Sequence, residues 1–268
     1  MQGTPQGLYS GLPKPAVELV ISLSGTHQCR ATRGGTPRTY SLGWLTPPQF
    51  APRWAQTTGR LHLIGARLTL QTVIGLFGHG ALIEQTVPVP LEDLLGRHAG
   101  LLAAQLADEE NDLRRMMTLA QWIRDTLRAP SHLPLPSGMD LAQMGWRVDA
   151  LAEHLGLSAR GLHKRFVQSY GFGPKAWLQL HRFDDLVSRG LAGGEQAFAD
   201  LAGDHGFSDQ AHMNREFRRF SGLTPRAYLA HRQSRAAPER APHFVPGSRP
   251  MAKDVQLESG IAPRPSIS

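Results

Sequence analysis

Two sets of side chains in the C-terminal half have types and spacings suited to contacts with the edges of base pairs. Within each set, partners lie three or four positions apart, so a helix brings them onto one face. The first set is Arg160, His163 and Lys164, and the second is Ala211, His212 and Arg215. Arginine, lysine and histidine donate hydrogen bonds, and donors on a helix can distinguish bases in the major groove. The chemistry predicted here is recognition without bond making.

Each set lies in one of two copies of a single helical design. The first copy spans residues 148–178 and the second spans residues 198–229. A shift of fifty positions superposes Leu151, Ala152, Gly156 and Ser158 on Leu201, Ala202, Gly206 and Ser208. After one inserted residue, a shift of fifty-one superposes Phe166, Gly171 and Pro174 on Phe217, Gly222 and Pro225. Repetition at this period indicates duplicated supersecondary units.

Each copy is predicted to form a helix-turn-helix unit. In the first copy, apolar residues recur at helical spacing up to Leu155, and Gly156 ends this short helix. Ser158 is a suitable N-cap for a second helix, which carries Phe166 on its buried stripe and closes at Gly171. The corresponding residues of the second copy are Gly206, Ser208, Phe217 and Gly222. A helix over residues 175–189, closed by Gly190, Gly193 and Gly194, is predicted to join the units.

The paired units, and above all the stretch GFSDQAHMNREFRRFSGLTPRAY at residues 206–228, resemble the DNA-binding domain of the AraC/XylS-type bacterial transcription regulators. The resemblance covers roughly residues 141–231. It implies that two recognition helices enter successive major grooves on one DNA face. The DNA-binding positions that it implies are Arg160, His163, Lys164, Gln210, Ala211, His212, Arg215 and Arg219. Ala211 and Gly161 are smaller than the polar residues often found at such positions, which predicts few or water-mediated contacts there.

Charge differs between the two recognition helices. The first contains Arg160, Lys164 and Arg165 and no acid, whereas Asp209 and Glu216 interrupt the arginines of the second. We therefore expect the first helix to contribute more base readout, and the second, through Arg218 and Arg219, to hold the phosphate backbone. Other basic residues are open to two readings, as phosphate contacts or as a solvated face: Lys175, Arg182, Arg189 and Arg226.

The composition is consistent with a polyanionic partner. The net charge is +7 and the pI is about 10.2, which by themselves do not separate nucleic acid from a membrane surface. No apolar run reaches the ~18 residues of a membrane span, and no secretory leader is evident. The single cysteine, Cys29, can form neither an internal disulfide nor a cysteine-based zinc site. We expect a cytoplasmic protein with no membrane association.

The N-terminal half predicts a different kind of structure. Residues 1–15 are rich in glycine and proline and are expected to be irregular, while residues 17–23, 39–45 and 59–70 favour strands of a small antiparallel domain. Helices are expected within residues 91–106 and over residues 112–127. Met116 and Met117 suit core or subunit packing, with an adaptable ligand surface as the alternative.

The fold class predicted is α+β, with a β-rich sensor domain and packed helices followed by an all-α domain containing two helix-turn-helix units. The domains expected are an effector-sensing and dimerisation domain over residues 1–130, a linker over residues 131–140, the DNA-binding domain over residues 141–232 and a disordered tail over residues 233–268.

Enzymatic chemistry has little support. The sequence lacks GxGxxG, the Walker lysine loop, GxSxG and HExxH. His205 and His212 are close in sequence, but no third metal ligand is indicated. No catalytic residue, metal or cofactor is therefore expected. The DNA-repair alkyl-acceptor proteins that share a similar DNA-binding unit use several cysteines, and this chain has one.

The function predicted is a sequence-specific transcription regulator controlled by a small molecule at the N-terminal domain. Activation is the expected mode, but the sequence leaves activation and repression open. Its expected partners are double-stranded DNA, the small-molecule effector, RNA polymerase and a second copy of the chain. One alternative is a DNA-binding regulator whose N-terminal domain only dimerises or binds another protein. Another is an enzyme with an appended DNA-binding unit.

Overall fold

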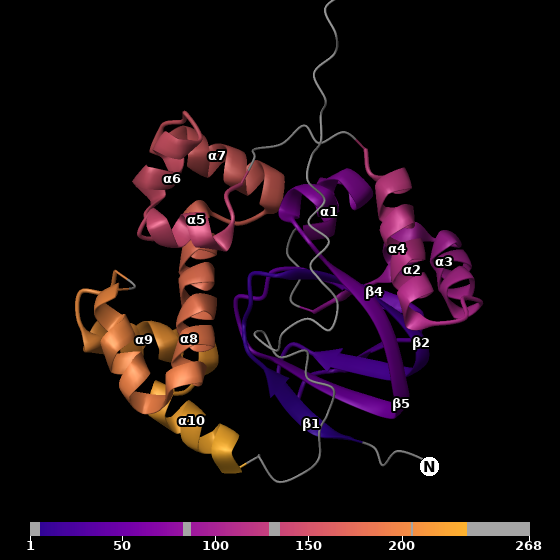
Figure 1. Ribbon diagram of the computed structural model, residues 1–268, viewed down its shortest axis with the longest axis horizontal. Coiled ribbons are helices and arrows are strands. Elements are labelled where there is room, and N and C mark those ends of the chain that lie inside the picture. Colours follow the sequence, from indigo (N-terminus) through magenta and orange to yellow (C-terminus); the bar gives the residue numbers. More distant parts are fainter. Residues whose placement is uncertain (1–5, 83–86, 129–134, 205, 235–268) are drawn as a thin grey trace, which may run out of the picture. The chain divides into compact units, whose positions relative to one another are not determined.

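The protein has an α+β fold, in which an antiparallel sheet with packed helices is followed by a helical region containing two helix-turn-helix units (Figure 1). The computed structural model describes residues 6–82, 87–128, 135–204 and 206–234. Here the sheet region denotes residues 6–128 without the gap at 83–86, and the helical region denotes the described residues from 135 onward.

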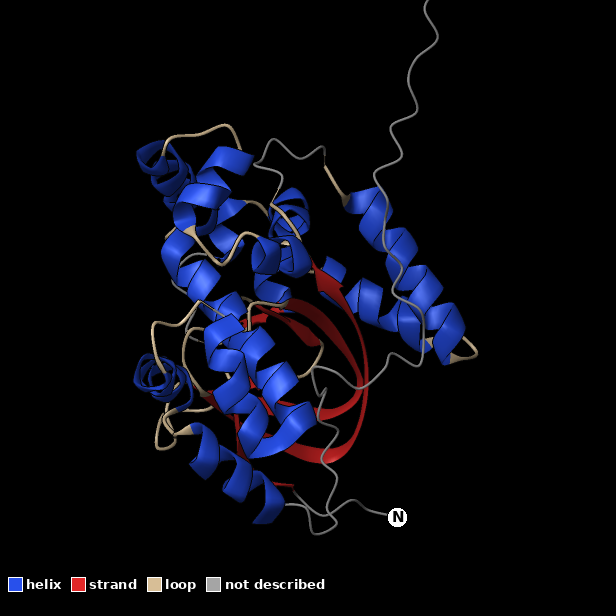
Figure 2. Ribbon diagram, turned by 60° about the vertical axis from the view of Figure 1, so that its left-hand side comes forward, coloured by secondary structure: helices blue, strands red, loops and turns tan. Residues whose placement is uncertain are grey.

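The sheet has six strands in the order β1-β5-β2-β4-β6, with β3 paired to β2. The strands are β1 (Gln6–Gly11), β2 (Val17–Arg30), β3 (Arg38–Tyr40), β4 (Gly43–Thr46), β5 (Arg53–Leu68) and β6 (Val89–Pro90). Every pairing is antiparallel. The long strands bend strongly along their length (Figure 2). Register shifts in the β2–β5 pairing, between Ser22 and Thr26, fit such a bend because a bulge increases the local twist.

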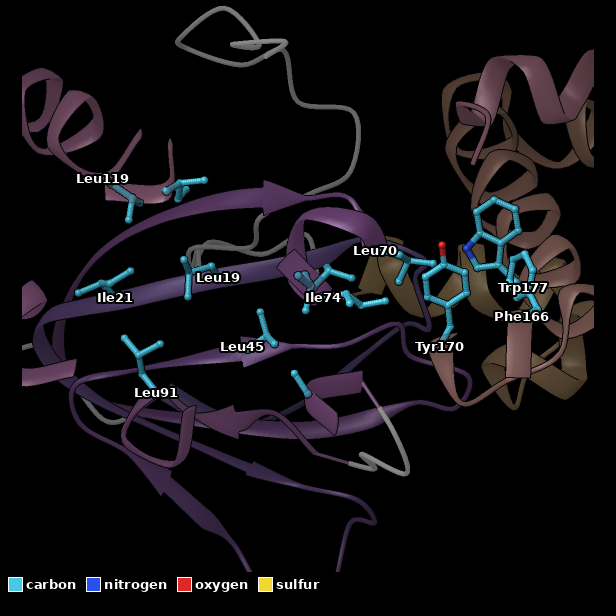
Figure 3. Close-up of a cluster of buried hydrophobic side chains, with 14 of the residues drawn as sticks. Leu19, Ile21, Leu45, Leu70, Ile74, Leu91, Leu119, Phe166, Tyr170 and Trp177 are labelled. Carbon is cyan, nitrogen blue, oxygen red and sulfur yellow. The ribbon is translucent and has the colours of Figure 1, made fainter. Parts of the chain in front are cut away.

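Helices of the sheet region cover one face of the sheet. They are α1 (Leu70–Phe77), the short 3-10 helix η1 (His79–Leu82), α2 (Leu91–Leu95), α3 (His98–Ala107) and α4 (Asp112–Thr126). Leu19 of β2 lies opposite Leu45 of β4, and both are fully buried in one cluster with Leu106 and Leu119. Figure 3 shows Leu19, Ile21 and Leu45 on this face. The predicted helices over residues 91–106 and 112–127 are thus present.

The sheet contains more strand than the sequence pattern indicated. Residues 6–11, expected to be irregular, form β1 and pair with β5 from Gln6 to Gly11. Similarly, β2 continues past residue 23 to Arg30, and β5 starts at Arg53 rather than near residue 59. These segments lack clear alternation of apolar residues, and the ladder hydrogen bonds that hold them come from backbone groups, which every residue type except proline supplies. Helix α1 was also missed.

The helical region begins with α5 (Gly138–Gln143), whose N-cap is Ser137. Its first residues fall inside the predicted linker, because Ser137 and Asp140 form a reciprocal capping box. Residues 129–134 of that linker lie outside the described residues, as does the predicted tail from residue 235 onward. The boundaries proposed for the domains stay predictions.

Both helix-turn-helix units have the predicted recognition helix. The first unit pairs α6 (Val148–His154) with α7 (Ala159–Tyr170), and the second ends in α9 (Gln210–Ser221), which α10 (Pro225–Ser234) follows. Ser158 caps α7 by accepting the Gly161 backbone N–H at 3.1 Å. Gly171 and Gly222 close α7 and α9 in the left-handed conformation, with φ near +79° and +77°. The N-cap of α9, however, is Asp209 rather than Ser208.

The joining helix is longer than predicted. Helix α8 runs from Pro174 to Asp204 and continues through the glycines that were expected to end it (Figure 1). A glycine weakens a helix by only about 1 kcal/mol, so packing can override it. Gly190 is such a case, because a Cβ there would lie 2.4 Å from the ring of Phe198. The missing side chain at Gly190 makes room for an aromatic ring and does not terminate the helix.

Candidate nucleic-acid interface

Aromatic packing fixes which face of α7 is buried. Leu162, Phe166 and Tyr170 recur every four residues and are all fully buried. The Phe166 ring lies 4.9 Å from that of Tyr170 and 5.4 Å from that of Trp177 on α8. Figure 3 shows these three rings together. The remaining face of α7 is therefore the one available to a partner.

The predicted residues of α7 are all on its exposed side. Arg160, His163 and Lys164 are exposed, as is Arg165. His163 Cε1 lies 3.2 Å from the Cβ position that a side chain at Gly173 would occupy, so the imidazole rests over the loop after the helix. Helix α7 carries no acidic residue. A cationic face free of acids is suited to a polyanion.

Helix α9 is held in the same way. Its buried side chains include Met213, Phe217 and Phe220. The Phe217 ring packs 5.3 Å from Phe183 and edge-on to Phe198 at 5.5 Å, both on α8. Because α7 and α9 each pack on α8, one helix positions both recognition helices.

Most of the predicted residues of α9 are exposed. They are Gln210, Ala211, Arg215 and Arg219, together with Arg218. His212 differs, since it is half-buried, and its ring lies edge-on to Phe207 at 5.4 Å. Its Nδ1 is 3.3 Å from the Ser208 hydroxyl oxygen. The imidazole thus braces the turn before α9, and its contact with DNA stays a prediction.

The turn before α9 uses its acid as a cap. The Asp209 carboxylate accepts the backbone N–H of His212 at 2.6 Å and the Ser208 hydroxyl at 3.1 Å. Both hydrogen bonds hold the pKa of Asp209 below its usual range, and the bond from the His212 backbone has the larger effect. A negative charge at the start of a helix also interacts favourably with the helix dipole.

Glu216 does not face outward, which corrects the charge pattern inferred for α9. Its side chain is only 5% exposed and forms an ion pair with Arg182 of α8 at 2.6 Å. Arg182 Nε also donates to the other Glu216 oxygen at 3.0 Å. The outward face of α9 therefore carries its arginines without Glu216, while Asp209 stays exposed at the start of the helix. The larger share of base readout expected for α7 stays a prediction.

Arg182 is consequently excluded as a phosphate contact. Its guanidinium is occupied by Glu216 and by the Gly206 carbonyl at 3.4 Å, and it stacks 4.2 Å above the Phe207 ring. Burying a charged pair is tolerated only when the remaining hydrogen-bonding groups are satisfied, and this arrangement meets that condition. Arg189, by contrast, is exposed and pairs with Asp185 one turn away.

Gln179 also belongs to the site, although the sequence pattern does not indicate it. Its amide nitrogen donates to Glu216 at 3.3 Å, and its amide oxygen accepts from Arg219 at 3.1 Å. Arg219 therefore connects the exposed face of α9 to the buried ion pair. Spacing gave no indication of this link, because Gln179 lies 37 and 40 residues from its partners.

Metal-binding side chains and membrane-spanning helices are two further features that concern this part of the chain. Nowhere in the described ranges do three or more His, Cys, Asp or Glu side chains gather closely enough to hold a metal ion. None of the helices that the structure describes combines the length and apolar character that a membrane span needs. His205 lies outside the described residues.

Comparison with known proteins bears on the same region. Residues 151–231 match the family described as "Helix-turn-helix domain". The virulence regulon transcriptional activator VirF of Yersinia enterocolitica and the thermoregulatory protein LcrF of Yersinia pestis are each 30% identical over 81 residues. These residues make up 30% of this chain and 30% of each relative, so the chain covers less than a third of the relatives that it matches.

Two solved structures show a looser similarity over more of the chain. ToxT from Vibrio cholerae is 13% identical, with a TM-score of 0.44, over 85% of this chain and 98% of ToxT. The AraC-like transcriptional activator CuxR is 17% identical, with a TM-score of 0.24, over 68% of this chain and 74% of CuxR.

Proposed function

We propose that the protein is a sequence-specific DNA-binding regulator of transcription of the AraC/XylS type, a proposal supported by the helix-turn-helix match over residues 151–231 and by the similarity of this part to VirF. The observation that carries the proposal is the arrangement of α7 and α9. Each buries an aromatic stripe against α8 and leaves outward a face of basic and polar side chains.

The DNA-contacting residues that we propose lie on these two faces. Arg160, His163 and Lys164 belong to α7, and Gln210, Ala211, His212, Arg215 and Arg219 belong to α9. Arginine and lysine pair with the guanine edge, and glutamine pairs with adenine, in the major groove. Because Arg215 and Arg160 are both exposed, we assign base readout to both helices. Arg218 and Arg219, later on α9, serve the phosphate backbone.

One subunit would then occupy two successive major grooves without a palindromic site. Recognition helices that meet one face of B-DNA lie about one helical turn apart, ~34 Å or ~10 bp. Since α8 holds both helices, their separation is fixed, and a DNA site lengthened by one base pair between its two halves should bind more weakly.

The partners beyond DNA follow from this proposal. The Yersinia relatives are named as a transcriptional activator and a thermoregulatory protein, and we propose activation through RNA polymerase in the cytoplasm, by binding and without catalysis.

A second copy of the chain is the partner proposed for α3 and α4. These helices expose Leu101 and Leu113 at 62% and 67%, and exposed apolar patches often mark protein interfaces.

Control of DNA binding is proposed to reside in the sheet region, through a small-molecule effector. The competing view, in which this region only dimerises or contacts another protein, makes a different prediction. A ligand at a hundred times its dissociation constant stabilises a binding domain by roughly 2.7 kcal/mol. No small molecule would do so if the sheet region is only an interaction module.

The test is selection of binding sites from fragmented genomic DNA with the purified full-length chain, followed by fluorescence anisotropy on the selected sequence. Arg160→Ala and Arg215→Ala are compared with Arg60→Ala, an exposed arginine of β5 in the sheet region. We expect each recognition-helix variant to lose discrimination at one or two base pairs, by ~1–3 kcal/mol, and Arg60→Ala to bind like the parent. Recovery of no enriched motif would refute sequence-specific binding.

A further inference from the structure

Arg53, the first residue of β5, is a buried cation on the sheet face opposite the packed helices. Its exposed fraction is 6%. In the sheet register Cys29 lies opposite Ala55, and His27 lies opposite both Thr57 and Tyr40. Paired residues and residues two apart along a strand share a face. Arg53 therefore lies on the same face as His27, Cys29 and Tyr40.

This face is lined with rings. The imidazole of His27 stacks on Trp44 at 4.5 Å, and Tyr40 lies 5.6 Å from Trp44. Val20 lies opposite Trp44 in the register, whereas Leu19 and Leu45 form the neighbouring pair on the other face. Tyr40, Trp44 and Cys29 form a buried cluster separate from the core beneath the helices.

Within the described ranges of the chain, the guanidinium of Arg53 has no counter-ion. Its Nη1 is inaccessible and without a hydrogen-bond partner, and no ion pair of this side chain is found among the residues that the structure describes. Asp93, whose charge acts on the Tyr40 hydroxyl, forms a 2.5 Å ion pair with the exposed Arg38 instead. An unpaired buried charge is costly, so its retention calls for a partner that comes from outside.

The titratable neighbours cannot supply the missing negative charge. Burial raises the pKa of the Cys29 thiol and of the Tyr40 hydroxyl, so both are neutral near pH 7. The Tyr40 hydroxyl donates to the Pro88 carbonyl at 2.7 Å. Burial also lowers the pKa of His27 to about 4, which keeps that ring neutral and adds no second cation. Arg53 itself stays charged because a guanidinium does not lose its proton in proteins.

We propose that the sheet region binds a small organic carboxylate whose carboxylate group pairs with Arg53 and whose apolar body packs against the rings of Tyr40 and Trp44. This inference rests on the proposed control of DNA binding by an effector and names the chemical class of that effector. A planar guanidinium fork matches a carboxylate through two parallel hydrogen bonds. One unpaired arginine suits a single negative charge, and the buried rings of Tyr40 and Trp44 on the same face favour a ligand with an apolar body.

The experiment uses thermal melts of the full-length protein with benzoate, phenylacetate and decanoate, and with benzamide as the uncharged match to benzoate. The variants are Arg53→Met, which keeps the shape and removes the charge, and Arg60→Met on the same strand, whose side chain is exposed. We expect at least one carboxylate, but not benzamide, to raise the melting temperature of the parent and of Arg60→Met. Arg53→Met should bind that carboxylate ~30-fold or more weakly.

The unliganded variant provides a second, independent outcome. Replacing an unpaired buried charge by an apolar group should raise the melting temperature of Arg53→Met above that of the parent, because binding residues are often kept at the expense of stability. A structural arginine would instead lower it. The proposal is overturned if Arg53→Met melts below the parent, if no carboxylate stabilises the parent, or if Arg53→Met responds like the parent. Loss of DNA binding by the parent would refute the proposed function alone, since melts report carboxylate binding directly.

Discussion

The buried pair between Arg182 of α8 and Glu216 of α9 should contribute strongly to the stability of the helical region. The perturbation is Arg182→Met, which keeps the aliphatic stem and removes the guanidinium. Among the described residues, it leaves Glu216, whose side chain is 5% exposed, with the 3.3 Å hydrogen bond from Gln179 as the remaining contact. The matched control is Arg189→Met, two turns along the same helix, where the arginine side chain is 55% exposed.

The magnitude follows from burial. Two unit charges about 4 Å apart attract by about 4 kcal/mol at an effective dielectric constant near 20. Removing one partner of a buried pair leaves the other uncompensated and costs ~3–5 kcal/mol, a large part of the ~5–15 kcal/mol that stabilises a typical domain. The exposed pair at Arg189 should contribute only ~0.2–1 kcal/mol.

The assay is urea denaturation of the full-length variants, followed by circular dichroism at a fixed salt concentration. The double variant Arg182→Met with Glu216→Leu should recover much of the loss, since replacing both charges by apolar groups of similar size is often neutral. If Arg182→Met costs no more than Arg189→Met, water reaches the pair and the burial argument fails. If the double variant is as unstable as the single one, lost packing rather than an unpaired carboxylate is the cause.

Four further outcomes are expected. Phe217→Ala should lower the free energy of unfolding by ~3–5 kcal/mol in urea melts, because its ring is fully buried, and an unchanged melt would mean that the buried face of α9 is misassigned. Gly190→Ala should destabilise by ~1–3 kcal/mol, although alanine favours helices, because its Cβ would lie 2.4 Å from an aromatic ring, and a stabilised variant would refute this packing. Arg218→Ala should weaken binding to all DNA sequences alike and reduce the salt slope by about one, whereas Arg160→Ala should change the selected motif. The pKa of His181 is lowered from 6.5 to about 4 by burial, so the unfolded chain takes up its proton first and stability should fall as pH drops from 6.5 towards 4. His181→Phe should remove up to ~3 kcal/mol of the stability loss that occurs between pH 6.5 and 4, and an unchanged pH profile would contradict the assigned burial.

Much of the helical region could be predicted from sequence because its determinants are local. The apolar stripe that carries Phe166, the N-cap Ser158 and the closing Gly171 all act within one helix of twelve residues. The one-residue error at the start of α9 has a local cause too, since Ser208 and Asp209 are both good caps and only geometry chooses the aspartate.

The sheet was harder to predict because its determinants are not local. β1 is held by pairing with β5. Gly11, the last residue of β1, pairs with Arg53, which lies more than forty residues later in the chain. A glycine-rich segment at such an edge is specified by the neighbouring strand and scarcely by its own side chains. The buried guanidinium of Arg53 could not be inferred either, because its burial depends on the same distant pairings.

The candidate interface shows the same division between local and distant information. Exposed positions such as Arg160 and Arg215 follow from helical phase, which the sequence displays. The inward turn of Glu216 does not, because its partner Arg182 lies 34 residues earlier, on another helix. Without a known partner, a charged residue on a helix is expected to face the solvent. This expectation wrongly placed Glu216 on the outward face of α9.

The glycines of α8 explain why this partner is needed. Gly190, Gly193 and Gly194 all lie in the second half of α8, and each weakens the helix by ~1 kcal/mol relative to alanine. Helical propensity alone would therefore not hold this part of α8 in place between the two units. Contacts that span this segment must do so: the Phe198 ring against Gly190 and, across to α9, the pair of Arg182 with Glu216. The second recognition helix is thus oriented by tertiary contacts that DNA does not touch, which is why changes at these buried residues should disturb binding without removing a single DNA contact.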